Sequence, residues 1–210
     1  MSEGTGASTD ALLAEAIGLV NVGRGAHALQ LCERAVASRS PHAGLLQLFA
    51  VLLRRAGREA EALRAIEASV ALRPDHVPSL LIAAELAGDL EHSASAERAY
   101  ERVVALEPAQ VDAWFALALL RQDRYDLAGA EAALREVLRV APPRAEVEVN
   151  LGIVLQEAGR LDEAMRAYGR ALRLADASFG RIAHALAAPA TGRLWLDLDA
   201  LREHLRALPA

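Results

Sequence analysis

The feature that most constrains the fold of this chain is a 34-residue repeat, which runs through most of the sequence without a gap. One such step leads from Ala28 to Ala62. Four columns of the repeat share one register. They are an alanine column (Ala28, Ala62, Ala96, Ala130, Ala164), a small column (Ala16, Ala50, Ala84, Ala118, Gly152), an aliphatic column (Val36, Val70, Val104, Leu138, Leu172) and a proline column (Pro74, Pro108, Pro142). Although alanine is abundant, coincidence does not explain four columns in register.

Each repeat is predicted to form two amphipathic helices joined by a turn. Gly23, Gly57 and Gly159 share the turn column, where a residue with positive φ ends the first helix. The proline column ends the second helix, because the residue before a proline disfavours the α region. Alanine, leucine, arginine and glutamate dominate the composition and favour helix throughout. The five predicted units are 9–42, 43–76, 77–110, 111–144 and 145–178.

These columns resemble the pattern of the tetratricopeptide repeat (TPR) family, whose unit is also a 34-residue helix–turn–helix. The fifth unit matches best, with Leu151, Gly152, Gly159, Ala164, Tyr168 and Ala171, and the fourth supplies Trp114, Leu117, Ala118, Ala130, Leu134 and Pro142. The first unit is degenerate, with Glu15 and Cys32 at pattern positions. The resemblance implies an all-α, right-handed α-solenoid of five units. It says little about function, because the pattern residues are packing residues.

The two ends depart from the repeat. Residues 1–8 are small and polar and are expected to form a disordered tail. Residues 179–210 are predicted to cap the last repeat, with a short helix from Ser178 to Ala188 and a final helix N-capped by Asp197 or Asp199. Trp195 is expected to cover the last repeat. A dimer contact or a junction to a further domain are the alternatives for this segment.

Composition excludes several classes of protein. All 23 basic residues are arginine, so a P-loop, a pyridoxal enzyme and a protein kinase, which each need a lysine, are excluded. The same bias is typical of a GC-rich bacterial genome. A net charge of −5 argues against nucleic-acid binding. The sequence has no apparent signal peptide and no apolar run of membrane-spanning length, so we expect a cytoplasmic protein without membrane contact.

Candidate catalytic and metal-binding residues each have a structural interpretation. Cys32 falls in a packing column and is expected to be a buried hydrophobe. His42 and His76 occupy the same position in adjacent repeats, but no convergent carboxylate or thiolate completes a metal site. Most acidic residues alternate with arginine on helix faces that we expect to be solvated. The chain is therefore predicted to be no enzyme and to need no metal or cofactor.

In TPR proteins the first helix of each unit lines a concave groove, so the resemblance implies a partner-binding surface here. The residues that map to it are Gln47, Val51, Arg54, Arg55, Leu81, Glu85, Asp89, Asp112, Phe115, Leu119, Gln122, Asp123, Glu146, Val149, Asn150, Ile153 and Glu157. They form an apolar stripe that is basic in the second unit and acidic in units three to five. Such a surface suits a peptide with basic residues beside an aliphatic anchor. The lysine-dependent clamp of co-chaperone TPR domains is excluded.

The sequence thus predicts a protein-interaction scaffold or adaptor that binds a partner protein or peptide in this groove. One alternative is a recognition or regulatory module that serves a modifying enzyme of the transferase or hydroxylase type. That enzyme would be a separate chain or the remainder of a longer one. A self-assembling homo-oligomer and docking through the convex face also stay open.

Asn150 is expected to pair with the backbone of the bound peptide, as its column does in related TPR proteins. Asp123 and Glu157 are expected to attract a basic residue.

Overall fold

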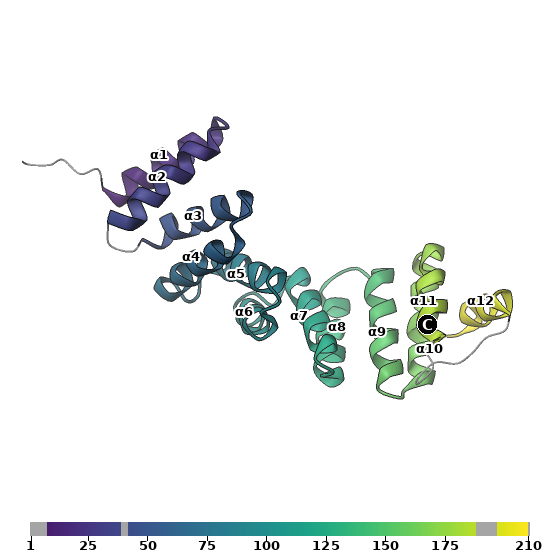
Figure 1. The fold of residues 1–210 in the computed structure, drawn as a ribbon. Coiled ribbons are helices and arrows are strands. Elements are labelled where there is room, and N and C mark those ends of the chain that lie inside the picture. Colours follow the sequence, from purple (N-terminus) through teal and green to yellow (C-terminus); the bar gives the residue numbers. More distant parts are fainter. Residues whose placement is uncertain (1–7, 39–41, 188–196, 210) are drawn as a thin grey trace, which may run out of the picture. The chain divides into compact units, whose positions relative to one another are not determined.

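The structure is a computed structural model that describes residues 8–38, 42–187 and 197–209, and within these ranges it is all helical (Figure 1). It divides into two compact bodies, residues 1–107 and 108–210. The N-terminal body holds α1 (Thr9–Asn21), α2 (Gly25–Ser38), α3 (Ala43–Arg55), α4 (Glu59–Leu72), α5 (Val77–Asp89) and α6 (Ser93–Leu106). The C-terminal body holds α7 (Val111–Asp123), α8 (Leu127–Val140), α9 (Ala145–Glu157), α10 (Leu161–Leu174), the 3₁₀ turn Asp176–Ser178, α11 (Phe179–Leu186) and α12 (Leu198–Ala207).

The helices follow the period of the sequence. The first helices of the five pairs begin exactly one repeat period apart, at Thr9, Ala43, Val77, Val111 and Ala145. The second helices also keep this spacing, from Gly25 to Leu161. From α1 to α6 and from α7 to α10, each helix packs against the next along the chain within its body, whereas α11 contacts α9 and α12 contacts α10. The predicted all-α helical-repeat fold, with five helix pairs and a C-terminal helical segment, is confirmed.

The turn between paired helices needs one residue in the left-handed region. Gly23, Gly57 and Gly159 take φ of 75°, 73° and 77° there, as the turn column predicts. The third and fourth repeats have Glu91 and Tyr125 at this position, with φ of 60° and 64°. Two residues with side chains therefore adopt a backbone conformation that glycine tolerates more easily.

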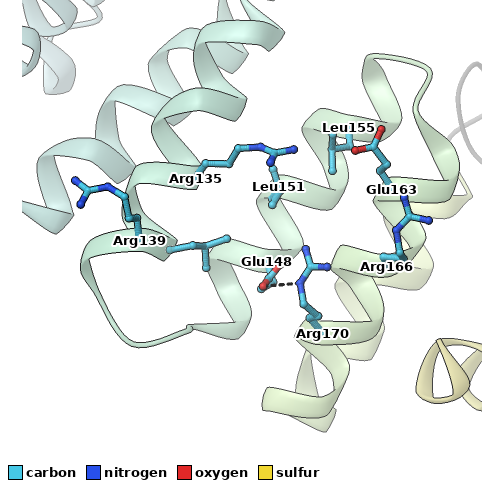
Figure 2. Close-up of a pocket in the computed structure, with 9 residues that line it drawn as sticks. Arg135, Arg139, Glu148, Leu151, Leu155, Glu163, Arg166 and Arg170 are labelled. Atoms are coloured by element: carbon cyan, nitrogen blue, oxygen red, sulfur yellow. Dashed lines mark hydrogen bonds and ion pairs between the residues drawn. The ribbon is translucent and has the colours of Figure 1, made fainter. Parts of the chain in front are cut away.

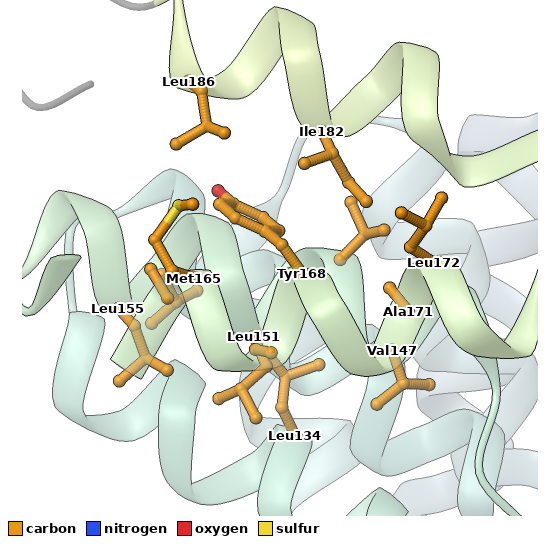
Figure 3. Packing of buried hydrophobic residues seen from close by; sticks show 14 of the residues in the cluster. Leu134, Val147, Leu151, Leu155, Met165, Tyr168, Ala171, Leu172, Ile182 and Leu186 are labelled. Carbon is orange, nitrogen blue, oxygen red and sulfur yellow. The ribbon is translucent and has the colours of Figure 1, made fainter. Parts of the chain in front are cut away.

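Close packing explains the alanine and small columns. Every member of the alanine column is fully buried, so the helices approach at these positions without room for a larger side chain. In the C-terminal body the core extends from α7 through α8, α9 and α10 to α11 and α12. Figure 3 shows Tyr168 of α10 within this cluster, beside Met165 and facing Ile182 and Leu186 of α11.

The C-terminal helices cover the last pair. Asp197 N-caps α12 by accepting hydrogen bonds from the backbone N–H groups of Asp199 and Ala200 at 2.9 and 3.1 Å. Leu201 and Leu205 of α12 are buried against the core, whereas Leu198 is exposed. The predicted tail over residues 1–8, except Ser8, and the predicted role of Trp195 lie outside the described residues.

Candidate partner-binding face

In the N-terminal body, the predicted groove residues of α3 and α5 bind one another. Arg54 of α3 donates hydrogen bonds to Glu85 and Asp89 of α5, at 2.6 and 3.0 Å. The hydrogen bond to Glu85 is the main cause that raises the pKa of the Arg54 guanidinium. Arg54, a basic residue of this face, thus neutralises the carboxylates of Glu85 and Asp89 in the next repeat. Gln47, Val51 and Leu81 are half-buried, and Arg55 is exposed.

In the C-terminal body, polar contacts also join first helices. Gln122 at the end of α7 donates to Glu157 at the end of α9, with 3.1 Å between Nε2 and Oε2. Arg144, which precedes α9, lies 3.4 Å from Asp112 of α7. The first contact joins two predicted groove residues of consecutive repeats, and the second joins the predicted groove residue Asp112 to the residue that precedes α9. Phe115 and Ile153 are partly buried against the core, and Leu119, Asp123 and Glu146 are exposed.

Two predicted groove residues are buried. Val149 has no exposed surface, and Asn150 is only 6% exposed. The Oδ1 atom of Asn150 accepts a hydrogen bond from Arg181 of α11 at 3.0 Å. In this structure Asn150 therefore holds α11 against α9, and its carbonyl oxygen is already engaged.

A cavity of about 450 Å³ lies between α9 and α11. This volume is in the range typical of ligand pockets. Gln156 forms part of its wall, donating from Nε2 to the Ala185 carbonyl at 2.8 Å and accepting from the Tyr168 hydroxyl at 3.0 Å. The lining residues are Ile153, Gln156, Glu157, Gly180, Arg181, His184 and Ala185.

The cap that the sequence pattern predicts over residues 179–188 does not include a contribution of α11 to this face. One more step of the repeat period from Ala145, the start of α9, reaches Phe179, the start of α11. The helix therefore keeps the register of the first helices. Extending the repeat by one period thus predicts that Arg181, His184 and Ala185 lie on a further first helix, like the other groove residues.

The cysteine and the two histidines have local roles. Cys32 is fully buried, and burial raises the pKa of its thiol to about 11, which disfavours the nucleophilic thiolate. His42 accepts a hydrogen bond from the Leu45 backbone N–H at 3.2 Å and so caps α3. Nδ1 of His76 lies 2.9 Å from the Ser79 hydroxyl. Within the described ranges, no three His, Cys, Asp or Glu side chains gather where they could hold a metal ion.

Comparison with known proteins agrees with this architecture. Residues 145–178, the α9–α10 pair with the 3₁₀ turn, match the tetratricopeptide repeat model. This match shows one tetratricopeptide repeat at residues 145–178, and the helix pairs that precede it resemble it in length and spacing. A search of the curated proteins finds no significant match.

Solved structures of MamA share the fold. One designated MamA AMB-1 superposes with a TM-score of 0.72 at 17% sequence identity, covering 79% of this chain and 90% of that one. MamA from Desulfovibrio magneticus RS-1 gives a TM-score of 0.67 at 17% identity, covering 82% of this chain and 97% of that one. At such identity the similarity concerns the fold. Neither the family match nor these neighbours support the alternative of a recognition module for a modifying enzyme.

None of the helices in the described ranges is both long and apolar enough to cross a membrane.

Proposed function

We propose that this chain is a non-catalytic protein-interaction module. We propose further that one face of its C-terminal body, formed by α7, α9 and α11 and called here the first-helix face, binds a peptide segment of a partner protein. The cavity between α9 and α11 carries this proposal. It offers apolar surface at Ile153 and Ala185, with the Glu157 carboxylate at its edge. A concave, mostly apolar site with few polar groups suits an aliphatic side chain as the anchor.

The charge of the same face supports a basic residue beside the anchor. Glu157 is half-buried, and its hydrogen-bond partner Gln122 is neutral, so this contact does not offset the charge of a carboxylate. Asp123 is exposed at the end of α7. An arginine or lysine that follows the aliphatic residue would meet these carboxylates. Complementary charge of this kind mainly affects the association rate and its salt dependence.

The test is an array of peptides with Arg or Lys beside Leu, followed by titration calorimetry of the best binder. Glu157→Arg is expected to weaken binding about tenfold or more at low salt, because it replaces attraction with repulsion. Ile153→Asp is expected to abolish binding by placing a charge in the cavity. Glu203→Arg, an exposed charge reversal on α12, is the control for net charge and is expected to leave the affinity unchanged.

Full affinity in both Glu157→Arg and Ile153→Asp would place the binding surface elsewhere. Asn150→Ala is a less direct probe than the sequence implied. Because Asn150 is buried and bonded to Arg181, its loss is expected to loosen α11 as well as any bound peptide. Circular dichroism of each variant separates loss of binding from loss of fold.

A further inference from the structure

A second cavity, of about 530 Å³, opens between α8, α9 and α10 of the C-terminal body (Figure 2). It shares no residue with the cavity between α9 and α11. Its floor is apolar, with Leu138 of α8 and Leu151 and Leu155 of α9. Figure 2 shows arginines of α8 and α10 on either side of α9.

Glu148 of α9 is unusual in this cavity. Its side chain is only 5% exposed, although the equivalent positions of the preceding repeats hold Leu46, Leu80 and Trp114. A buried carboxylate at an apolar position of a repeat costs free energy unless all its acceptor sites are satisfied. Arg170 donates from Nε to Oε1 of Glu148 at 2.8 Å, but Oε2 is buried and accepts no hydrogen bond within the described residues.

Four arginines line the cavity. Arg135 pairs with Glu131 at 2.6 Å, Arg139 pairs with Glu136 at 2.8 Å, and Arg170 pairs with Glu148. In the part of the chain that the structure describes, the exposed Arg166 guanidinium takes part in no hydrogen bond or ion pair. Glu163, which also lines the cavity, interacts with Arg166 electrostatically, but its carboxylate is paired with Arg160 at 2.6 Å. The cavity therefore places a guanidinium that can bind an anionic ligand group, that of Arg166, beside a carboxylate oxygen that lacks a hydrogen-bond donor within the described residues, Oε2 of Glu148.

An equivalent cavity in the N-terminal body serves as an internal comparison. It has about 260 Å³ and lies between α4, α5 and α6, at positions two repeat periods earlier in the chain. There Leu80 replaces Glu148, Glu67 replaces Arg135, and Arg98 corresponds to Arg166. The smaller cavity has the ordinary apolar wall of the repeat. The buried carboxylate and the additional arginines are thus specific to the C-terminal cavity.

We propose that the cavity between α8, α9 and α10 binds a peptide segment with an acidic side chain next to an aliphatic one. The acidic side chain pairs with Arg166, and the aliphatic one packs on Leu138 and Leu151. A backbone N–H of the segment donates to Oε2 of Glu148. A fully ionised inorganic anion offers no donor to Oε2 of Glu148, whereas a polypeptide supplies both an anionic side chain and a backbone N–H, so a polypeptide fits the site better.

The test measures fluorescence anisotropy of a labelled, capped Gly-Ser-flanked peptide with a central Leu-Asp-Leu. Saturable binding is expected at low salt. Binding of the matched Leu-Asn-Leu peptide is expected to be about tenfold weaker, because the charge-assisted contact is lost. Inorganic phosphate at the same ionic strength is expected not to displace the peptide.

The variants separate this site from non-specific attraction. Arg166→Gln and Glu148→Leu are each expected to weaken binding about tenfold, through loss of the cation and of the acceptor. Glu148→Leu restores the apolar column, so its melting temperature is expected to hold or rise. Arg98→Gln, the matched change in the N-terminal cavity, is expected to leave the affinity unchanged.

Three results with the peptides and variants would each overturn the proposal. They are the absence of saturable binding at millimolar peptide, equal affinity for the two peptides, and equal losses for Arg98→Gln and Arg166→Gln. Competition by phosphate alone would also overturn it, because the site would then recognise an anion and no peptide. The Glu157→Arg variant, which alters only the first-helix face, is expected to bind the Leu-Asp-Leu peptide normally.

Discussion

Gly152 of α9 lies directly against the ring of Tyr168 of α10. A Cβ atom built on Gly152 would be 2.3 Å from Cε1 of that ring. The preceding repeats hold alanine where this repeat holds Gly152, and among the described residues Tyr168 is the largest fully buried side chain. The smaller residue on one helix thus makes room for the larger residue on the other.

Gly152→Ala is therefore expected to destabilise the C-terminal body by about 1–3 kcal/mol, because the buried ring has no free space to enter. Chemical denaturation monitored by circular dichroism measures this change. Gly18→Ala is the control, since a Cβ at this exposed position of α1 meets nothing within 4 Å. That variant is expected to be neutral or slightly stabilising. Equal stability of Gly152→Ala and the wild type would contradict the packing described here.

The two turns without glycine are expected to store strain. Glu91→Gly and Tyr125→Gly should each raise the free energy of unfolding by about 0.5–1 kcal/mol, because glycine adopts positive φ without a steric cost. Tyr125 is 70% exposed, so its side chain contributes little packing. Thermal melts measure the gain, and Gly159→Ala provides the opposite control with an expected loss. Destabilisation by both glycine substitutions would show that their side chains matter more than the backbone.

Gly169 sets the distance between α10 and α12. A Cβ at this position would lie 2.6 Å from the backbone oxygen of Leu205 in α12. Gly169→Ala is expected to push α12 away and to speed amide hydrogen exchange across residues 198–207, with little change in α7 or α8. Gly88→Ala, where a Cβ meets nothing within 4 Å, is the matched control. Unchanged hydrogen exchange in α12 would contradict the prediction that close approach at Gly169 is needed to hold α12 against α10.

Acid stability is expected to depend on the turn arginines. Arg58 donates to Glu61 at 2.7 Å and to Glu33 at 2.5 Å, and the hydrogen bond to Glu61 lowers the pKa of that carboxyl. A carboxyl with a lowered pKa stabilises the fold above its unfolded pKa of about 4.5, and this stabilisation disappears as the pH falls through the lower, folded value.

Glu61→Gln is therefore expected to reduce the melting temperature at pH 7 and to converge on the wild type as the pH falls and the wild-type carboxyl becomes protonated. Melting curves between pH 7 and pH 2 measure this convergence. Glu59→Gln, two residues earlier on the same helix, is the control for the loss of one carboxylate from the first turn of α4. A constant difference between Glu61→Gln and the wild type at every pH would exclude this linkage.

The sequence determined the period, the helix pairs and the turns, because these follow from local rules. Glycine at Gly23, Gly57 and Gly159 and proline after the second helices act within a few residues of their own position. The alanine column predicted close helix contacts in the same way. The absence of lysine excluded whole classes of enzyme before any contact was known.

Tertiary structure decided which of the predicted binding residues are accessible. The repeat phase assigned Asn150 and Arg54 to a binding groove. Whether they face a ligand depends on α11 and α5, which lie 31 to 35 residues away and engage them. Glu148 illustrates the same limit. Its spacing marks an apolar position, but only the packed arrangement of α8, α9 and α10 shows a buried carboxylate oxygen beside an arginine-lined cavity. Local sequence rules set each helix, whereas burial and pairing of a charge depend on distant neighbours.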